Sequence, residues 1–411
     1  MRAMAVLSVL VSVLATTPAL ASGSGLAKRL GSAMSPAGSW SSAYVVNADS
    51  SKAVFSWSHT TPRILASNTK LFTTAAALAR FGTEGTLATE VRGMGELGEK
   101  GVWRGDLYLV GGGDPTFGSR SFTRAAYGQV GSTVEALAAQ IHKAGVERVA
   151  GRVYGDESGF DSLRGGPESG YGISPWVGPL SALAYNRGLA TESGASWQAN
   201  PPAFVAATLT DALRRRGIGV RDRPTAGQAP KSAETLAAVE SPPMSRIAAL
   251  TNKPSDNYFA ETLVKALALQ ARGRGTTAAG ARIAARFAKR IGGRPSRLVD
   301  GSGLSRGNRA SPYRIVRMLL AMRKRDEFRA FLRSLSIAGR DGTLGPRMRR
   351  GPARGYCRGK TGTLSNVSAV SGYCRARSGD TYVFSILMNG VDPYGARQLQ
   401  DSMLQALAGV R

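Results

Sequence analysis

Three short polar motifs lie far apart along this chain, and together they constrain its fold more than any other feature. The first begins a run whose apolar periodicity predicts a helix over 71–81, the second falls between two predicted helices, and the third falls in a predicted strand. Side chains from such distant segments can act together only if the fold brings a helix start, an interhelical loop and a strand to one cleft. The motifs are Ser67-Asn68-Thr69-Lys70, Ser255-Asp256-Asn257 and Lys360-Thr361-Gly362-Thr363.

The spacing of Ser67 and Lys70 places both side chains on one face of a helix, about 5–6 Å apart. An N-cap serine followed by a surface lysine would also explain this pair. However, Lys70 is the only lysine of the chain with a serine three residues before it, and Lys360 is the only lysine followed by threonine. The three motifs in this order therefore favour a functional interpretation.

The residue types indicate nucleophilic catalysis by a serine. A serine hydroxyl is a poor nucleophile until a base takes its proton, and a lysine can be that base only when it is partly neutral. Burial, the positive end of a helix and a neighbouring cation each lower the pKa of a lysine. We expect all three to act on Lys70, with Lys360 as the neighbouring cation, so that Lys70 activates Ser67.

The other two motifs supply the remaining groups that acyl transfer needs. Ser255 can pass a proton to a leaving amine, and Asn257 can hold Lys70 or a substrate amide. Lys360 attracts a carboxylate, to which the neighbouring threonines of its strand can donate hydrogen bonds. The backbone N–H groups of Ser67 and Thr363 are expected to form an oxyanion hole, in which one donor is worth about 3 kcal/mol to the transition state.

The first residues predict a secretory signal peptide. An apolar stretch over 4–14 is followed by Ala19-Leu20-Ala21, so cleavage is expected after Ala21. A membrane anchor is the alternative, but the apolar stretch is too short to span a bilayer comfortably, and no later stretch could span one either. We therefore expect an exported protein, in the periplasm or the extracellular cell wall, with no transmembrane span after cleavage.

The chain is strongly basic, with a formal charge of +27 from 54 Lys and Arg against 27 Asp and Glu. Such a charge attracts polyanions, and for an exported protein anionic cell-wall polymers or acidic membrane surfaces are the expected partners. Only 11 of the 54 cations are lysine, so an arginine-rich genomic composition is the alternative explanation. Nucleic acid is not an expected partner, since no basic stretch is interleaved with aromatic residues.

The two cysteines and two histidines are too few and too scattered for a zinc site, so no metal and no cofactor are expected. Cys357 and Cys374 lie in two strand-like segments joined by a short connection. Export permits a cross-strand disulfide between them. Two unpaired buried thiols are an equally simple interpretation.

The pattern of elements changes along the chain and predicts two units. Residues 22–84 and 236–411 predict a hairpin, several helices, including 278–291 and 313–325, three strands near the end and a last helix over 397–407. Residues 85–235 predict an inserted β-rich domain with one helix near 132–144, another that ends at Gly217, and a polar linker over 221–235. We expect the three motifs to meet within the first unit.

Beyond the three motifs, longer stretches resemble the low-molecular-mass class C penicillin-binding proteins, which are D-alanyl-D-alanine carboxypeptidases and endopeptidases of peptidase family S13. β-Lactamases share the three motifs but not these stretches, which cover most of the mature chain. They are "LVGGGDPTF" (109–117), "VGPLSALAYNRG" (177–188), "TNKPSDNYFAE" (251–261), "DGSGLSRGNRASP" (300–312) and "GKTGTLSNVSAVSGYC" (359–374).

The resemblance implies an α+β fold, a β-lactamase-like transpeptidase domain with a five-stranded antiparallel sheet flanked by helices and a helical subdomain. Extra domains are inserted between the Ser-x-x-Lys and Ser-x-Asn motifs. These two motifs lie closer together than we expect for members with two inserted domains, so this chain is expected to lack the second.

The resemblance also implies a pocket for the side chain of the third stem residue of peptidoglycan. Asp114 of "GGGDP" resembles an aspartate that reaches from the inserted domain to the amino end of that side chain, although a β-turn aspartate before proline is the alternative. Arg306 of "GLSRGN" resembles a residue that lines the same pocket with Leu364 and Ser365. A surface arginine is the alternative for Arg306.

The sequence therefore predicts an exported serine DD-peptidase that hydrolyses D-Ala-D-Ala stem peptides or D-Ala cross-links of peptidoglycan, with β-lactams as covalent inhibitors. The predicted catalytic residues are Ser67, Lys70, Ser255, Asn257 and Lys360, and the predicted substrate-binding residues are Thr361, Gly362, Thr363, Leu364, Ser365, Asp114 and Arg306. A β-lactamase, and a non-catalytic cell-wall-binding protein on the same scaffold, are the competing hypotheses.

Overall fold

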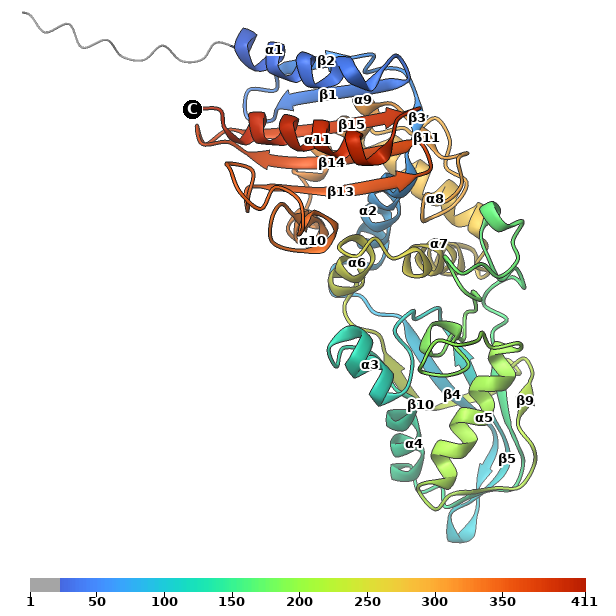
Figure 1. Ribbon diagram of the computed structural model, residues 1–411. Coiled ribbons are helices and arrows are strands. Elements are labelled where there is room, and N and C mark those ends of the chain that lie inside the picture. Colours follow the sequence, from blue (N-terminus) through green and yellow to red (C-terminus); the bar gives the residue numbers. More distant parts are fainter. Residues whose placement is uncertain (1–22) are drawn as a thin grey trace, which may run out of the picture.

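A computed structural model describes residues 23–411 of the chain, and the predicted signal peptide over 1–21 lies outside the described residues. The chain forms two units that lie end to end (Figure 1). We call residues 23–84 and 241–411 the main unit and residues 85–240 the inserted unit. Within residues 23–411, no helix has the length and apolar character needed to cross a membrane.

The main unit is built on one antiparallel sheet in which the chain's beginning lies beside its end. The strand order is β12-β13-β14-β15-β1-β2. The expected five strands are present, and β12 adds a sixth at the edge, because two residues are too short to give a sequence pattern. The strands are β1 (Ser41–Asn47), β2 (Ala53–Trp57), β12 (Ser336–Ile337), β13 (Cys357–Leu364), β14 (Val367–Arg375) and β15 (Thr381–Asn389).

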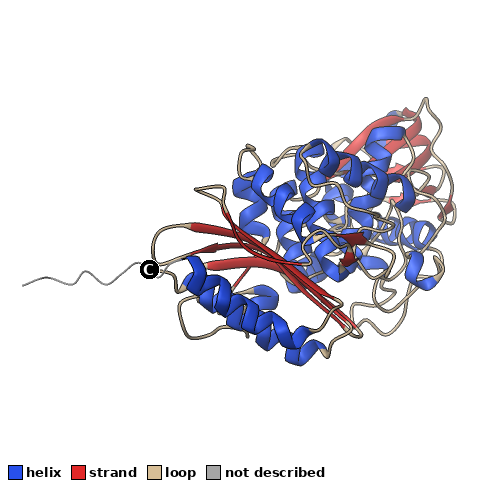
Figure 2. Ribbon diagram, turned by 90° about the horizontal axis from the view of Figure 1, so that it is seen from above, coloured by secondary structure: helices blue, strands red, loops and turns tan. Residues whose placement is uncertain are grey.

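Helices cover both faces of this sheet (Figure 2). Successive side chains of a strand point to opposite faces, so Val383 and Leu387 of β15 pack into the core shared with α2 (Thr69–Phe81) and α9 (Pro312–Met322). Phe384 and Ile386 pack on the other face, against α1 (Gly23–Met34) and α11 (Pro393–Ala408). β14 and β15 are therefore buried along almost their whole length, and β15 is a nearly continuous apolar run.

The remaining helices of the main unit cluster beside α2. The second motif lies where α6 ends and α7 begins. The predicted helices near 278–291 and 313–325 are confirmed as α8 and α9, with ends shifted by one to three residues. A short two-stranded ladder joins the segment before α2 to that before α9. The two strands of this ladder are β3 (Arg63–Ile64) and β11 (Arg309–Ala310). The helices are α6 (Met244–Asn252), α7 (Asn257–Arg272), α8 (Thr277–Arg290) and α10 (Phe328–Ser334).

The inserted unit contains a seven-stranded mixed sheet, with helices packed on it, and is therefore less purely β than the sequence indicated. Apolar residues of α4 and α5 share one buried cluster with the strands. The elements are β4 (Ala88–Leu97), β5 (Val102–Gly111), α3 (Arg120–Tyr127), α4 (Val134–Lys143), β6 (Arg148–Val149), β7 (Val153–Asp156), α5 (Pro201–Arg214), β8 (Gly219–Val220), β9 (Thr225–Ala226) and β10 (Glu234–Glu240).

The predicted boundary at residue 235 falls inside a strand. β10 pairs with β4 along its whole length, from Glu234 opposite Gly93 to Glu240 opposite Ala88. The predicted linker over 221–235 likewise contains β9. Both strands have weak alternation in the sequence, and only their pairing partners earlier in the chain, β7 for β9 and β4 for β10, identify them as part of the inserted sheet.

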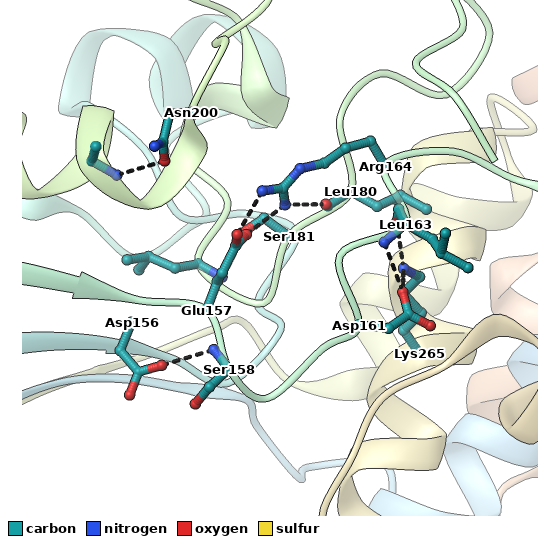
Figure 3. A network of polar contacts seen from close by, with 12 residues as sticks. Asp156, Glu157, Ser158, Asp161, Leu163, Arg164, Leu180, Ser181, Asn200 and Lys265 are labelled. Atoms are coloured by element: carbon teal, nitrogen blue, oxygen red, sulfur yellow. Dashed lines mark hydrogen bonds and ion pairs between the residues drawn. The ribbon is translucent and has the colours of Figure 1, made fainter. Parts of the chain in front are cut away.

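A buried ion pair holds the segment after β7 against the main unit, and a half-buried pair stabilises that segment internally (Figure 3). Lys265 of α7 is fully buried and donates to Asp161 over 2.6 Å. Arg164 forms two 2.5 Å contacts with Glu157 and donates to the carbonyl of Leu180 over 3.0 Å. Because a buried charge left unpaired costs several kcal/mol, the pair of Lys265 and Asp161 fixes this segment of the inserted unit against α7, the helix that begins with Asn257.

Cys357 and Cys374 lie directly opposite each other on β13 and β14 and form a disulfide. The loop that it closes has a sequence separation of 17 residues, for which the chain-entropy model gives about 3 kcal/mol of stabilisation. Of the two interpretations of the cysteines, the structure therefore supports the cross-strand bridge.

We expect denatured, unreduced protein from an oxidising compartment to show no free thiol in a thiol titration, because both cysteines are in the bridge. The same protein should show two thiols after reduction, and its melting temperature should fall, since the unfolded chain gains freedom. Two thiols before reduction would contradict the disulfide.

Candidate active site

Ser67 lies in a short 3₁₀ turn, Ala66–Asn68, that leads directly into α2. Ala66 has a positive φ of 46°, a strained conformation that is typical of functional sites. The turn is packed between two glycines. A Cβ on Gly303 would lie 1.8 Å from the Ala66 carbonyl, and one on Gly362 would lie 3.0 Å from the Ser67 nitrogen. Glycine is required at Gly303, where φ is also positive, for the loop to approach the nucleophile.

Lys70 is completely buried and contacts three oxygens. Its Nζ lies 2.9 Å from Ser67 Oγ, 2.7 Å from Asn257 Oδ1 and 2.7 Å from the carbonyl oxygen of Ser302. The last two atoms can only accept hydrogen bonds. When Lys70 is neutral, its two N–H bonds satisfy those acceptors and its lone pair faces the Ser67 hydroxyl. The geometry is therefore that of a base positioned for this serine.

The third motif brings a second buried lysine to the same cleft. Lys360 Nζ lies 2.8 Å from Ser255 Oγ and 2.9 Å from the carbonyl oxygen of Thr361. Ser255 has a positive φ of 64°, the conformation that turns the chain from α6 into α7. Asn68 of the first motif donates to the Lys360 carbonyl over 3.1 Å. The structure thus brings all five predicted catalytic residues together.

Burial is the main cause of the lowered pKa of both lysines. It lowers the pKa of Lys70 to about 8, while the carboxyl groups of Asp300, Asp256 and Glu261 act in the opposite direction. The charged groups that act on Lys70 are therefore acidic, and the expected contribution of Lys360 is not among them. Burial, with the charge of Lys70 as a smaller cause, holds the pKa of Lys360 well below its usual range.

We expect acylation of Ser67 by a penicillin to speed up as the pH rises and to level off above pH 8. Only neutral Lys70 can accept the serine proton, and below its pKa of about 8 the neutral fraction falls about tenfold per pH unit. The measurement is the acylation rate between pH 5 and 9 with stopped-flow fluorescence, for which about one tenth of the maximum is expected near pH 7. A rate that is flat over this range would remove Lys70 as the titrating base.

Two residues behind Lys70, Ser302 and Glu261, were not identified from the sequence. Ser302 supplies a carbonyl to Lys70, and the N–H groups of Gly301 and Ser302 donate to the buried Glu261 over 3.1 and 2.8 Å. Burial, with the charge of the neighbouring Asp300 as a second cause, raises the pKa of Glu261 to about 8. Both residues lie inside stretches that carry the family resemblance, but only their positions next to Lys70 reveal a supporting role.

The inserted unit reaches the second motif through Arg187. Its guanidinium forms 2.6 and 3.2 Å contacts with the carboxylate of Asp256. Asp256 also caps α7 by accepting from Phe259 N over 3.0 Å. Since Asp256 stands between Ser255 and Asn257, this pair fixes the position of both predicted catalytic residues. Sequence reasoning missed Arg187, although it lies in one of the family-like stretches.

We expect Arg187→Ala to lower the free energy of unfolding by about 1–3 kcal/mol, because it leaves the half-buried Asp256 carboxylate unpaired. Acylation by penicillin should slow at the same time, since Ser255 and Asn257 lose their support. Thermal unfolding and acylation kinetics measure both effects. Arg221→Ala is the matched control, because its exposed pair with Asp222 should leave both measurements unchanged. Normal acylation by Arg187→Ala would contradict the positioning role.

The two threonines of the third motif line a hollow of about 500 Å³ beside β13. Thr361 donates to Thr343 over 2.6 Å, and Thr363 accepts from Arg397 of α11 over 3.2 Å. Arg347, a second guanidinium in the wall of this hollow, pairs with Asp401. Arg397 was not predicted, and its position adds a positive charge to the side of the cleft where a carboxylate is expected.

Arg306 and the predicted residues after the third motif are also brought together. Arg306 Nη2 donates to the carbonyl and the hydroxyl of Ser365 over 2.6 and 2.5 Å, and Nη1 donates to Asn366 over 3.0 Å. Leu364, the last residue of β13, directly precedes them. The structure therefore supports a shared role for these residues over an isolated surface arginine.

Asp114 forms no hydrogen bond with Arg306 or with the predicted residues after the third motif among residues 23–411. Its carboxylate accepts hydrogen bonds from the backbone and hydroxyl of Thr116, both over 2.7 Å, and from Ser132 over 2.5 Å. It is 1% exposed, and burial raises its pKa to about 6. Its partners all belong to the inserted unit, and the contact with Thr116 closes a turn. This geometry favours the turn interpretation of Asp114.

Comparison with known proteins gives one family. The model of the D-Ala-D-Ala carboxypeptidase 3 (S13) family matches residues 26–193 and 187–410. A D-alanyl-D-alanine carboxypeptidase from an Actinomadura species is 30% identical over 84% of this chain and 76% of its own length. A carboxypeptidase from Mycobacterium tuberculosis is 30% identical over 84% of this chain and 75% of its own length.

Solved structures share the fold. The crystal structure of penicillin-binding protein 4 from Haemophilus influenzae superposes with a TM-score of 0.74 at 21% identity, over 93% of this chain and 98% of that one. A predatory endopeptidase from Bdellovibrio bacteriovorus superposes with a TM-score of 0.57 at 19% identity, over 89% and 92% of the two chains. The expected α+β penicillin-binding fold with an insertion is confirmed.

Proposed function

This chain belongs to the peptidase S13 family of D-Ala-D-Ala carboxypeptidases and is a serine peptidase, and we propose that it is an exported DD-peptidase that acts through an acyl-enzyme on Ser67. Its substrates are the D-Ala-D-Ala ends of peptidoglycan stem peptides and the D-Ala cross-links between them. The observation that carries the proposal is the position of Lys70 Nζ, 2.9 Å from Ser67 Oγ and held by two acceptors on its other side.

In the first half-reaction, Ser67 Oγ attacks the carbonyl carbon of the penultimate D-Ala while its proton passes to Lys70. The carbon–nitrogen bond then breaks, and the leaving amine takes the proton that Lys70 received, with the Ser255 hydroxyl, which lies 2.8 Å from Lys360 Nζ, as the relay. In the second half-reaction, water attacks the ester carbonyl while one of its protons passes to Lys70, and the bond to Ser67 Oγ breaks as Lys70 returns that proton to the serine. The N–H groups of Ser67 and Thr363 are the proposed oxyanion donors, and the approach of Gly362 to the Ser67 nitrogen supports this assignment.

Substrate recognition involves both sides of the scissile bond. The carboxylate of the leaving residue is proposed to bind Thr361 and Thr363, with Arg397 beside them. The side chain of the third stem residue is proposed to bind next to Leu364, Ser365 and Arg306. Asp114 would enter that pocket only if it exchanged its contacts with Thr116 and Ser132.

The test is to mix the purified protein with a fluorescent penicillin and measure the intact mass. A stable adduct of one penicilloyl group on the peptide that contains Ser67 is expected. Consumption of the drug without an adduct would instead indicate a β-lactamase. An unchanged drug without an adduct would indicate a non-catalytic scaffold.

A second assay separates the two peptidase activities. Chromatography of products from a D-Ala-D-Ala pentapeptide measures carboxypeptidase action, and products from a cross-linked stem dimer measure endopeptidase action. If penicillin acylates the protein but the protein releases neither D-Ala nor monomer, both proposed substrates are contradicted. The acyl-enzyme chemistry would still stand.

A further inference from the structure

The segment between α10 and β13, which lies beside β13 on the main unit in Figure 1, concentrates positive charge. Residues 340–358 contain six arginines, no lysine and a single acid, Asp341. Two of the charges are neutralised nearby, since Arg347 pairs with Asp401 and Asp341 pairs with Lys253. Three other arginines, Arg349, Arg350 and Arg354, line a hollow of about 680 Å³ together with Gly339. We call this the arginine hollow.

None of the hydrogen bonds or ion pairs recorded among residues 23–411 involves the guanidinium groups of Arg349, Arg350 and Arg354. All three side chains are exposed. Like charges held close together repel one another, and a bound anion relieves that repulsion. The hollow therefore has an unused capacity for anions.

The backbone of the hollow is fixed on several sides. Gln405 of α11 accepts from Ala353 N over 2.9 Å and donates to the carbonyl of Arg350 over 2.7 Å. Gly355 N donates to the carbonyl of Ala338 over 2.8 Å, and the disulfide begins at Cys357. The arginines thus project from an anchored loop, so little backbone ordering is needed when a ligand binds.

Two glycines make room for arginine side chains in this loop. A Cβ on Gly339 would lie 2.9 Å from Arg354 Cγ and 3.1 Å from Arg349 Cα, and one on Gly355 would lie 2.8 Å from the guanidinium of Arg340. Both glycines have positive φ, 64° and 80°. Arg349 and Arg354 therefore both pack against Gly339, and Arg340 packs against Gly355.

The arginine hollow continues into a wider basic surface. Adjoining hollows of about 400 and 210 Å³ meet at Tyr356, which is 59% exposed. Arg358 and Arg375 line the first of them, and Arg375 and Arg377 line the second. The catalytic Lys360 lies further along β13, the strand that begins at Cys357. A long polymer could therefore occupy this surface without entering the catalytic cleft.

We propose that the arginine hollow and its neighbours bind a phosphodiester-linked polyanion of the cell wall and hold the enzyme beside its substrate. The guanidinium fork matches the oxygens of a phosphate in a bidentate manner, which a lysine cannot reproduce. Successive phosphates along the polymer are bound by the hollow and then by the arginines around Tyr356. The polymer is a second ligand and takes no part in the reaction of Ser67.

The experiment measures binding of the full chain to end-labelled poly(glycerol phosphate) by fluorescence anisotropy, between about 50 and 200 mM salt. The variant Arg349→Ala/Arg350→Ala/Arg354→Ala should lose about tenfold or more in affinity, and the magnitude of its salt slope should fall by about two to three. The corresponding triple Arg→Lys variant keeps the charge and should retain only part of the affinity.

The matched control removes three exposed arginines from α8, with Arg282→Ala/Arg286→Ala/Arg290→Ala. It has the same net charge as the first variant and should bind the polymer as the natural chain does. All variants should be acylated by penicillin at the natural rate, so the result is independent of the proposed function.

Three outcomes would overturn the proposal. Equal losses in both alanine variants would mean that the overall charge binds the polymer rather than this surface. Equal or tighter binding of polyglutamate would mean that phosphate is not the recognised group. Binding of phosphatidylglycerol vesicles, but not of the polymer, would make a membrane surface the partner.

Discussion

Ser67→Ala is expected to abolish covalent labelling by penicillin and to lower DD-peptidase turnover by about 10⁴-fold or more, the scale seen when a nucleophile is removed from an acyl-transfer enzyme. No other hydroxyl can replace it, because the acyl carbon must lie between the nucleophile and the oxyanion donors. Intact-mass analysis after a long incubation gives the labelling result, and product chromatography gives turnover.

The fold should survive this substitution. The Ser67 hydroxyl has one recorded side-chain contact, with Lys70, and α2 retains its buried apolar face. Thermal unfolding of Ser67→Ala should therefore match that of Ser50→Ala, an exposed turn variant that should label normally. A covalent adduct that persists in Ser67→Ala would refute the assignment of the nucleophile.

Lys70→Ala is expected to have an effect of similar size, because a nucleophile and its base act as one unit. Without Lys70, no group within hydrogen-bonding distance of Ser67 Oγ can accept its proton, as far as the contacts of residues 23–411 show. Acylation by penicillin should be too slow to measure by stopped flow. Lys143→Ala, at an exposed position of α4, is the control that removes a lysine elsewhere.

Lys70→Arg separates the role of a base from that of a positive charge. An arginine keeps the charge but is never neutral at accessible pH, so it cannot take the serine proton. We therefore expect Lys70→Arg to be as inactive as Lys70→Ala. Normal acylation by either variant would show that Lys70 acts only through its charge or not at all.

The local parts of this architecture could be predicted because they depend on neighbouring residues. Apolar spacing after Ser67 is enough to predict a helix, and strand-like alternation around Lys360 is enough to predict β13. The same reasoning placed Cys357 and Cys374 on neighbouring strands. It was less accurate where pairing is distant, as for β10, whose alternation is weak and whose partner β4 precedes it by more than a hundred residues.

The sequence by itself predicted the chemistry of this protein, because Ser67, Lys70 and Lys360 in motifs of this order, together with the longer family-like stretches, favour acyl transfer by a serine peptidase. Only the tertiary structure decided how that chemistry is supported. A pKa depends on burial and on charges contributed by distant segments, so the acidic surroundings of Lys70 could not be derived from its neighbours in the chain. For the same reason, the pairing of Arg187 with Asp256 became evident only when the inserted unit was seen against α7.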